Sequence, residues 1–340
     1  MNGRERVLGL IERRRIDRVP LMPITMMFAA DQIGVKYLQY VRDHRVLVEA
    51  QLRTAARFDL DLVSCISDPA REAADLGADV CFFDDQPPAI MDSNALLADK
   101  TQLGRLRVPD PGCGRRMADR LEAAALFRSR VGDEKLIEGW IEGPCALAAN
   151  LRGIDSLMLD FYDDPPFVTA LLEFATEVGI AFARAQRAAG VDLMGVGDAV
   201  SSLVGPAIFE PVIAPHHVRL VRALRSMGLK TRSHICGNTI RISAARARLG
   251  YDIVDIDADV PPALAREQMG PNTIILGNIP TVAVMANGTA AEVRECAAEC
   301  YRLLAPNHII SAGCEVPRTT PAANMDALTA FAHSLAPALT

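Results

Sequence analysis

The sequence lacks both a long apolar run and a secretion signal. Its N-terminus, MNGRERVLGLIERRR, carries charges on both sides of a short apolar stretch, whereas a signal peptide needs a longer apolar region and a cleavage site. The longest apolar runs, such as LMPITMMFAA, are far shorter than the roughly 20 residues of a membrane-spanning helix. We therefore expect a soluble, cytoplasmic protein that does not act at a membrane.

The sequence also lacks a concentration of positive charge. The formal net charge is −6, and no stripe of arginine and lysine with interleaved aromatic residues is present. Binding to nucleic acid depends on attraction to phosphates, so no nucleic-acid partner is expected. The densest basic run, ERRRIDR at 12–18, follows a short helical pattern and is interpreted as the solvated end of a helix.

Cysteine is sparse, with eight residues in a chain of 340, which is too few for a disulfide framework in so long a protein. Without an export signal we expect reduced thiols, some of which could bind a ligand. The chain also lacks an internal repeat, a low-complexity tract and a linker-like segment. We therefore expect one domain over 1–340, with enough hydrophobic residues to form a large core.

Short β-like runs alternate with longer helical patterns, as in an α/β protein with a parallel sheet. The expected strands cover eight segments, 19–24, 61–66, 135–143, 191–197, 229–235, 252–257, 273–278 and 308–313. Eight strands favour a (β/α)8 TIM barrel, although a doubly wound sheet uses the same units. An N-terminal helix is expected within 1–17. The irregular segment at about 77–134, with a hairpin-like VCFFDDQPPAIM, is interpreted as an insertion between the second and third barrel strands.

The stretch SHICGNT contains the most informative spacing in the chain. If 229–235 is a strand, His234 and Cys236 point to the same side at the C-terminal end, where a barrel has its active site. Cys314 follows the last expected strand at the equivalent end. Two thiolates and one imidazole suit Zn²⁺ and leave a fourth position for substrate, water or a carboxylate. Asp257, which ends the next strand, is the candidate for that carboxylate.

Other interpretations of the histidines and cysteines are open. His-x-Cys alone is a weak pattern, because a cysteine at a strand end is more often a small core side chain than a ligand. Cys296 and Cys300 lie one turn apart on an expected helix and are assigned to the core. His216 and His217 lie where a helix begins and are interpreted as surface or half-buried residues.

Carboxylates and amides at other strand ends form a second group of candidates. Glu142 and Asp198 are candidate catalytic residues, because a carboxylate at a barrel mouth can act as a general base or anchor a ligand. Asp68 is a candidate substrate-binding residue, although the proline after it favours a helix cap. Asn238 and Asn278 are substrate-binding candidates too, although turn geometry explains both.

The segments RSHICGNT, IILGNI and ISAGCEVPRTTPAANMDAL make the chain resemble the zinc-dependent methyltransferases of the uroporphyrinogen decarboxylase superfamily. The resemblance covers nearly the whole chain and implies a (β/α)8 barrel with Zn²⁺ bound by His234, Cys236 and Cys314. It implies transfer of a methyl group between a small methylated substrate (an ether, amine or thiol) and the cobalt of a corrinoid. No corrinoid domain is visible in the sequence, so the corrinoid (methylcobalamin) is expected from a separate corrinoid-binding protein.

One stretch departs from the namesake of the superfamily, which grips a tetrapyrrole with many carboxylates through an N-terminal arginine motif. The corresponding stretch here, PITMMFAAD, has no arginine, which argues against such a substrate because buried carboxylates need charged partners. Met26, Met27 and Phe28 better suit an apolar pocket for a small substrate, with Met26 as a substrate-binding candidate, unless all three are core. Glu142 departs from the coenzyme M type and favours the component that demethylates a methyl donor.

Two alternatives are kept. One is a tetrapyrrole decarboxylase like uroporphyrinogen decarboxylase, which leaves the histidine and two cysteines unexplained. The other is a non-catalytic zinc- or corrinoid-binding accessory protein, which would close its metal site with a fourth protein ligand. The oligomeric state is open, with a homodimer as one option.

Overall fold

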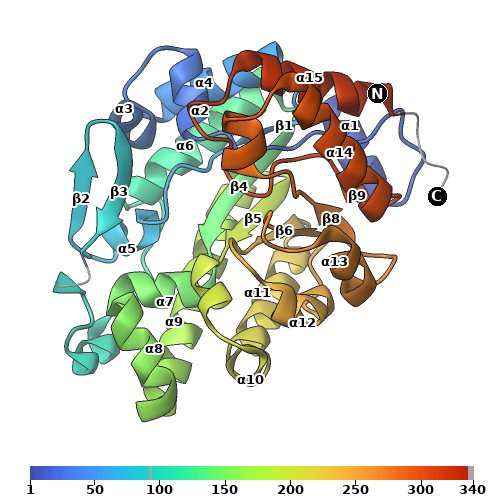
Figure 1. Ribbon diagram of the computed structural model, residues 1–340. Coiled ribbons are helices and arrows are strands. Elements are labelled where there is room, and N and C mark those ends of the chain that lie inside the picture. Colours follow the sequence, from blue (N-terminus) through green and yellow to red (C-terminus); the bar gives the residue numbers. More distant parts are fainter. Residues whose placement is uncertain (92–93, 336–340) are drawn as a thin grey trace.

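A curled parallel sheet forms the centre of the protein in the computed structural model, which describes residues 1–91 and 94–335 (Figure 1). The seven strands run in the order β1-β4-β5-β6-β7-β8-β9. Their bounds are β1 (Leu62–Ser64), β4 (Leu136–Glu142), β5 (Leu193–Gly197), β6 (Lys230–His234), β7 (Ile253–Asp255), β8 (Ile274–Leu276) and β9 (His308–Ile309). Each strand lies within one of the segments expected from the sequence.

The first expected strand, at 19–24, forms isolated bridges instead of a regular strand. Leu21 pairs with Ile310 and Ile24 pairs with Glu315, both in parallel. On its other side, the carbonyl of Leu21 accepts a hydrogen bond of 3.1 Å from the backbone N–H of Asp61. The segment therefore lies between the last and first strands of the sheet, and the whole is an α/β, TIM-barrel-like fold.

Helices surround the sheet (Figure 1). Their bounds are α1 (Gly3–Ile11), α2 (Met27–Gln32), α3 (Tyr37–Arg42), α4 (His44–Arg57), α5 (Arg71–Asp75), α6 (Arg116–Val131), α7 (Pro144–Arg152), α8 (Ile154–Asp163), α9 (Pro165–Ala188), α10 (Pro206–Ile208), α11 (Ala214–Ser226), α12 (Ser243–Arg248), α13 (Pro262–Met269), α14 (Ala290–Leu304) and α15 (Ala322–Ser334). Helices α4, α9 and α11 contact strands β1, β4 and β6. Each parallel strand is thus followed by chain that returns over the outside of the sheet, which leaves the C-terminal strand ends together on one side.

The segment between β1 and β4 contains the hairpin expected from VCFFDDQPPAIM. Strands β2 (Val80–Phe83) and β3 (Gln86–Ile90) pair in antiparallel fashion at the edge of the molecule (Figure 1). Helix α6 lies in the same segment and packs against α4, α9 and β4, so this part of the segment belongs to the helical layer around the sheet.

The N-terminal helix closes one end of the sheet. α1 is shorter than the expected 1–17 segment, and its Val7 and Leu10 are buried. They share a core cluster with the first residues of the strands, including Leu136, Leu193 and Ile253. The interior of the sheet at this end is therefore filled by apolar side chains.

Helix α9 is, among the described residues, long and apolar enough to cross a membrane by length and composition. More than half of its most apolar window is buried inside the protein. It contacts α7, α11 and β4, which is the packing of a core helix.

Candidate active site and metal centre

Strands β4 and β6 supply the side chains at the C-terminal ends of the sheet. Along a strand, residues two apart point to the same side, so Trp140 and Glu142 of β4 share a face. The parallel register pairs Glu142 with Gly197 of β5, and Gly197 with His234 of β6. Glu142 and His234 therefore lie at the same level of the sheet, two strands apart.

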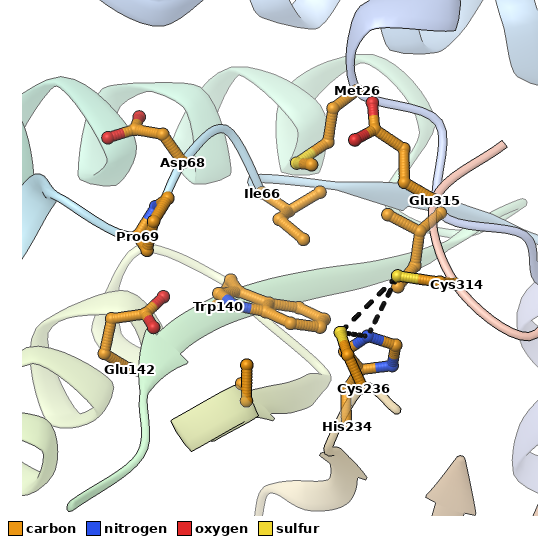
Figure 2. A pocket seen from close by; sticks show the side chains of 13 residues that line it. Met26, Ile66, Asp68, Pro69, Trp140, Glu142, His234, Cys236, Cys314 and Glu315 are labelled. Carbon is orange, nitrogen blue, oxygen red and sulfur yellow. Dashed lines mark hydrogen bonds between the residues drawn. The ribbon is translucent and has the colours of Figure 1, made fainter. Parts of the chain in front are cut away.

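His234, Cys236 and Cys314 form a compact three-ligand group (Figure 2). The Nε2 atom of His234 lies 3.0 Å from Sγ of Cys236 and 3.7 Å from Sγ of Cys314, and the two sulfur atoms are 3.5 Å apart. His234 ends β6, Cys236 follows two residues later, and Cys314 comes from the loop after β9. The equivalent strand ends that the sequence indicated are thus brought together.

The three-ligand group fits a zinc ion. Tetrahedral zinc, with Zn–S of about 2.3 Å and Zn–N of about 2.0–2.1 Å, places neighbouring ligand atoms roughly 3.4–3.8 Å apart. Two of the three distances in the group lie in this range, and the third, at 3.0 Å, is somewhat shorter. The donor set of two thiols and one imidazole also suits zinc chemically.

The pKa values of the two thiols are shifted by their contacts with each other and with His234. The hydrogen bond from Cys236, with His234 beside it, lowers the pKa of Cys314 to about 4. The same pairing raises the pKa of Cys236. The pairing thus favours ionisation of one sulfur, and the thiolate is the form of cysteine that binds metals.

A buried chain of charged groups supports His234 from behind. The Nδ1 atom of His234 lies 2.8 Å from Oδ2 of Asp255. Asp255 accepts hydrogen bonds of 2.8–3.0 Å from Arg232, whose other amino group lies 2.9 Å from Glu138. Burial opposes protonation of His234, but its hydrogen bonds to Asp255 and Cys314 raise its pKa to about 9. A carboxylate behind a histidine in this way fixes the ring and makes the outer nitrogen a better ligand.

A cavity of about 170 Å³ adjoins the three-ligand group. Its apolar walls include Ile24, Met26, Ile66 and Trp140, and Figure 2 shows the indole of Trp140 between the three-ligand group on one side and Glu142 and Asp68 on the other. Met26 is thus found in the pocket, as expected. Phe28 is 1% exposed and belongs to the main core, so the apolar stretch around it is only partly pocket.

Glycines in β5 leave room for the Trp140 indole. A Cβ atom at Gly195 would come within 2.3 Å of the ring, and one at Gly197 would lie 2.9 Å from its Nε1 atom. The indole also contacts the His234 ring, with centroids 5.9 Å apart. The small residues Gly195 and Gly197 of β5 therefore let the large Trp140 of β4 pack against His234.

Glu142 and Asp68 lie in the cavity wall on the far side of Trp140 from the metal ligands (Figure 2). Asp68 accepts a hydrogen bond of 2.6 Å from Arg116. Burial alone would raise the pKa of Asp68, but Arg116 and Arg71 hold it below its ordinary value. Burial, with Glu72 nearby, raises the pKa of Glu142 well above its ordinary range. Both candidates expected from the sequence thus line the pocket, but the carboxylate of Asp68 is fully buried and accepts hydrogen bonds from Arg116, Ser67 and the backbone N–H of Ala70, as a helix cap would.

Asp198 does not line the cavity, which corrects the position expected for a catalytic residue. Its carboxylate accepts hydrogen bonds from the backbone N–H of Ala146 at 2.5 Å and from Ser201 at 3.0 Å. It also lies 2.7 Å from Nε2 of His217, whose Nδ1 lies 2.8 Å from the hydroxyl of Tyr251. Because α7 begins at Pro144, the carboxylate faces the free N–H groups of a helix start, so it acts as a cap.

Asp257 stands outside the three-ligand group. Its Oδ2 atom accepts a hydrogen bond of 2.8 Å from the backbone N–H of Gly237. Within the described ranges the group that could hold a metal comprises His234, Cys236 and Cys314 alone. The carboxylate is instead used to shape the turn that carries Cys236.

Asn238 and Asn278 are likewise placed away from the cavity. Asn238 is exposed, and its Oδ1 atom accepts from the N–H of Ile240, which is a turn contact. Asn278 is buried, and its amide donates to the carbonyls of Asp257 and Val260. The turn chemistry weighed for both residues therefore accounts for their contacts.

Two further cysteines and two histidines were assigned from the sequence, and three of these four assignments are confirmed. Cys300 is buried, and Cys296 packs against the same core, as expected. His216 is half-buried, also as expected, but His217 is fully buried, because it pairs with the carboxylate of Asp198.

Three residues of the site were not singled out from the sequence: Trp140, Asp255 and Glu315. Glu315 lines the cavity beside Cys314, accepts a hydrogen bond of 2.9 Å from the backbone of Met27, and has its pKa raised by burial to about 7. The signal for Trp140 was its place two residues before Glu142 on one strand, and that for Asp255 was its place two before Asp257. Glu315 has no comparable signal beyond its adjacency to Cys314.

Comparison with known proteins places this geometry in a family. Residues 2–335 match the description Uroporphyrinogen decarboxylase (URO-D). A methylcobamide:CoM methyltransferase, MtbA, of Methanosarcina mazei is 28% identical over 95% of this chain and 95% of its own length. A uroporphyrinogen decarboxylase of Frankia casuarinae is also 28% identical, over 86% of this chain and 79% of its own length.

A solved structure has the same fold. It is described as a methyltransferase from Methanosarcina mazei and superposes with a TM-score of 0.89 at 21% identity, covering 97% of this chain and 98% of its own. With the fold shared and the family description matched from end to end, the chain belongs to the uroporphyrinogen decarboxylase (URO-D) family.

Proposed function

We propose that the protein is a zinc-dependent methyltransferase that moves a methyl group between a small methylated compound and the cobalt of a corrinoid carried by a separate protein. The observation that carries the proposal is the three-ligand group at the wall of a cavity. The name of the MtbA relative, a methylcobamide:CoM methyltransferase, supports the same chemistry.

The residues of the site have separable tasks in this proposal. Zinc held by His234, Cys236 and Cys314 would act as a Lewis acid on the thiol, oxygen or nitrogen of the substrate. Asp255 keeps the Nδ1 side of His234 occupied, so that Nε2 faces the sulfur atoms. Three protein ligands leave a position for the substrate, as in catalytic zinc sites, whereas a structural site has four.

The cavity itself argues against a tetrapyrrole decarboxylase. Within residues 1–91 and 94–335, no lysine or arginine lines it, whereas a substrate with many carboxylates needs cationic partners when buried. A volume of about 170 Å³ also suits a small compound. The decarboxylase alternative leaves the three-ligand group without a role.

The proposed direction is removal of a methyl group from a donor, with transfer to cobalt. Glu142, which departs from the coenzyme M type, supports this choice because it adds a carboxylate to the wall of the cavity. The reverse reaction, from added methylcobalamin to a thiol, is a convenient assay. In it the thiolate supplies the electron pair of the new S–C bond, cobalt keeps the pair of the broken Co–C bond, and the thiol proton goes to solvent.

Metal content tests the proposal. Under reducing, zinc-replete conditions we expect about one zinc ion per chain, and we expect Cys314→Ala to lose it because two ligands bind weakly. Cys113→Ala is the matched control, since Cys113 is an exposed free cysteine, and it should retain the metal. Demethylation of methylcobalamin by thiols should follow metal content across the three proteins. A zinc-free wild-type protein would reopen the decarboxylase alternative.

A further inference from the structure

The cavity has two chemically different ends. At one end is the three-ligand group, and at the other end are Asp68 and Glu142, with Trp140 between them (Figure 2). Glu315 adds a third carboxylate to the lining. In the part of the chain that the structure describes, no basic side chain lines the cavity. The side chain of Asp68 is itself fully buried against Arg116, so a bound molecule would meet the carboxyl groups of Glu142 and Glu315, with no lysine or arginine in the described lining.

Glu142 is the carboxylate with unused bonding capacity. Its residue is 6% exposed, so it is more than nine-tenths buried. Its Oε1 atom lies 3.5 Å from Arg71, at the outer limit of a hydrogen bond, and its Oε2 atom has no hydrogen bond to any described residue. The Oε2 atom of Glu142 is not one of the fully buried unpaired atoms, so it is open to the cavity and available to a hydrogen-bond donor of a bound molecule.

The charges behind Glu142 do not neutralise it. Arg71 forms ion pairs with both Glu142, at 3.5 Å, and Glu72, at 3.7 Å, measured from its Nη2 atom. Arg116 forms an ion pair with Asp68. Two guanidinium groups thus face three carboxyl groups, which leaves one negative charge when all three are ionised. Burial, with Glu72 nearby, raises the pKa of Glu142, so its surroundings disfavour the ionised carboxylate, and a bound cation beside it would stabilise that charged form.

We propose that the substrate is a small compound with a cationic group, such as an ammonium, that binds at Glu142 while its methyl-transferring heteroatom lies at the three-ligand group. This inference rests on the proposed function and specifies its substrate class. The indole of Trp140 lies along the path between the two ends and offers an aromatic face, which attracts cations. Anionic compounds such as a sulfonated thiol would meet the carboxyl groups of Glu142 and Glu315 without a cationic partner in the described lining.

A set of thiols of equal length and different charge tests the inference. The probes are 2-aminoethanethiol, 2-mercaptoethanol and 2-mercaptoethanesulfonate, titrated into the zinc-loaded protein. Trp140 is the single tryptophan of the chain, so its fluorescence reports binding in the cavity directly, without a corrinoid. We expect the cationic thiol to bind about tenfold more tightly than the neutral one, and the sulfonate to bind most weakly.

Glu142→Gln separates the effect of the carboxylate from the different acidities of the three thiols. The substitution keeps the shape and removes the charge, so the preference for 2-aminoethanethiol over 2-mercaptoethanol should fall about tenfold while binding of the neutral thiol changes little. Glu49→Gln is the control, because Glu49 is exposed and pairs only with Arg130 at the surface. If Glu142→Gln fails to fold, the order of the three thiols on the wild-type protein still decides the matter.

The outcomes distinguish this inference from the proposed function. If zinc and thiol binding are present but the sulfonate or the neutral thiol binds as tightly as the amine, the inference is overturned and the proposed function stands. An unchanged preference in Glu142→Gln overturns it as well. If neither zinc nor any thiol binds, the proposed function fails and the inference fails with it.

Discussion

The two nitrogen atoms of His234 have different partners, and this difference decides what the residue can do. Nδ1 is held by Asp255, and Nε2 faces Cys236 and Cys314. Burial would raise the pKa of Asp255, but Arg232 and His234 keep it below its ordinary value, so the carboxylate is ionised. A charged partner on one nitrogen leaves the other free to bind a metal.

Asp255→Asn should therefore weaken zinc binding about 10–100-fold, because the histidine loses the charge that orients it. Competition with a zinc-binding indicator of known affinity measures the change. Asp252→Asn is the control, since Asp252 bonds to the backbone of Thr231 and to Arg225 at the start of the same strand. Equal affinities for the two variants would show that Asp255 does not act through His234.

At the scale of secondary-structure elements, Asp198 links a strand to two helices through its hydrogen bonds. It follows β5, accepts from the N-terminal N–H groups of α7, and pairs with His217 of α11. The sequence could show only that a carboxylate follows a strand. Whether such a carboxylate faces the cavity or the next helix depends on how the helices pack. Here the N-terminal N–H groups of α7 lie within hydrogen-bonding distance of Asp198, and its carboxylate binds them.

Asp198→Asn should lower the free energy of unfolding by about 1–3 kcal/mol, because hydrogen bonds to a buried carboxylate are weakened. Zinc content should not change. Denaturation by urea measures the effect, with Asp326→Asn as the control, since the Asp326–Arg57 pair is exposed and should contribute less than about 1 kcal/mol. A variant with wild-type stability but no methyl transfer would support the catalytic role first expected for Asp198.

At the scale of the whole molecule, the interior of the sheet is layered. Apolar residues and α1 fill one end, the pairs of Glu138, Arg232 and Asp255 form the middle, and the cavity lies above them. Burying so many charges is costly unless each is paired, and the described middle layer pairs them. Through the contact between Asp255 and Nδ1 of His234, this layer supports the three-ligand group from below.

His308 shows how this burial makes stability depend on pH. Its Nε2 atom lies 2.6 Å from the carbonyl of Gly277, and burial lowers its pKa from 6.5 to about 4. Below pH 6.5 the unfolded chain takes up a proton that the folded protein refuses, so stability falls as the pH falls towards 4.

Between pH 6.5 and 4.5 the free energy of unfolding of the wild-type protein should therefore fall by about 2 kcal/mol more than that of His308→Gln. Glutamine keeps an N–H donor for Gly277 but does not titrate. Urea denaturation at the two pH values gives the comparison. If the free energy of unfolding falls equally in the two proteins, His308 takes up its proton in the folded state at its ordinary pKa, and the expectation is wrong.

The amino-acid sequence by itself determined the positions of the strands and the identity of the three-ligand group. Short apolar runs bounded by turn residues mark strands that are buried on both faces, and the two-residue spacing of His234 and Cys236 holds at the strand end although Cys236 lies just beyond β6. Cys314 could be added because parallel strands end at a common edge. These inferences needed only local backbone geometry and the rule that the C-terminal ends of parallel strands lie at the same edge of a sheet.

Tertiary structure alone decided which polar residues reach the cavity. Glu142 and Asp68 line it, although Asp68 also accepts a hydrogen bond from the N–H of Ala70, whereas Asp198, Asp257, Asn238 and Asn278 lie outside the lining and use their polar atoms on backbone groups nearby. All six follow strands, so the pattern could not separate them. The separation depends on which N–H and C=O groups are left without partners once helices and loops have packed, and a sequence does not contain that information locally.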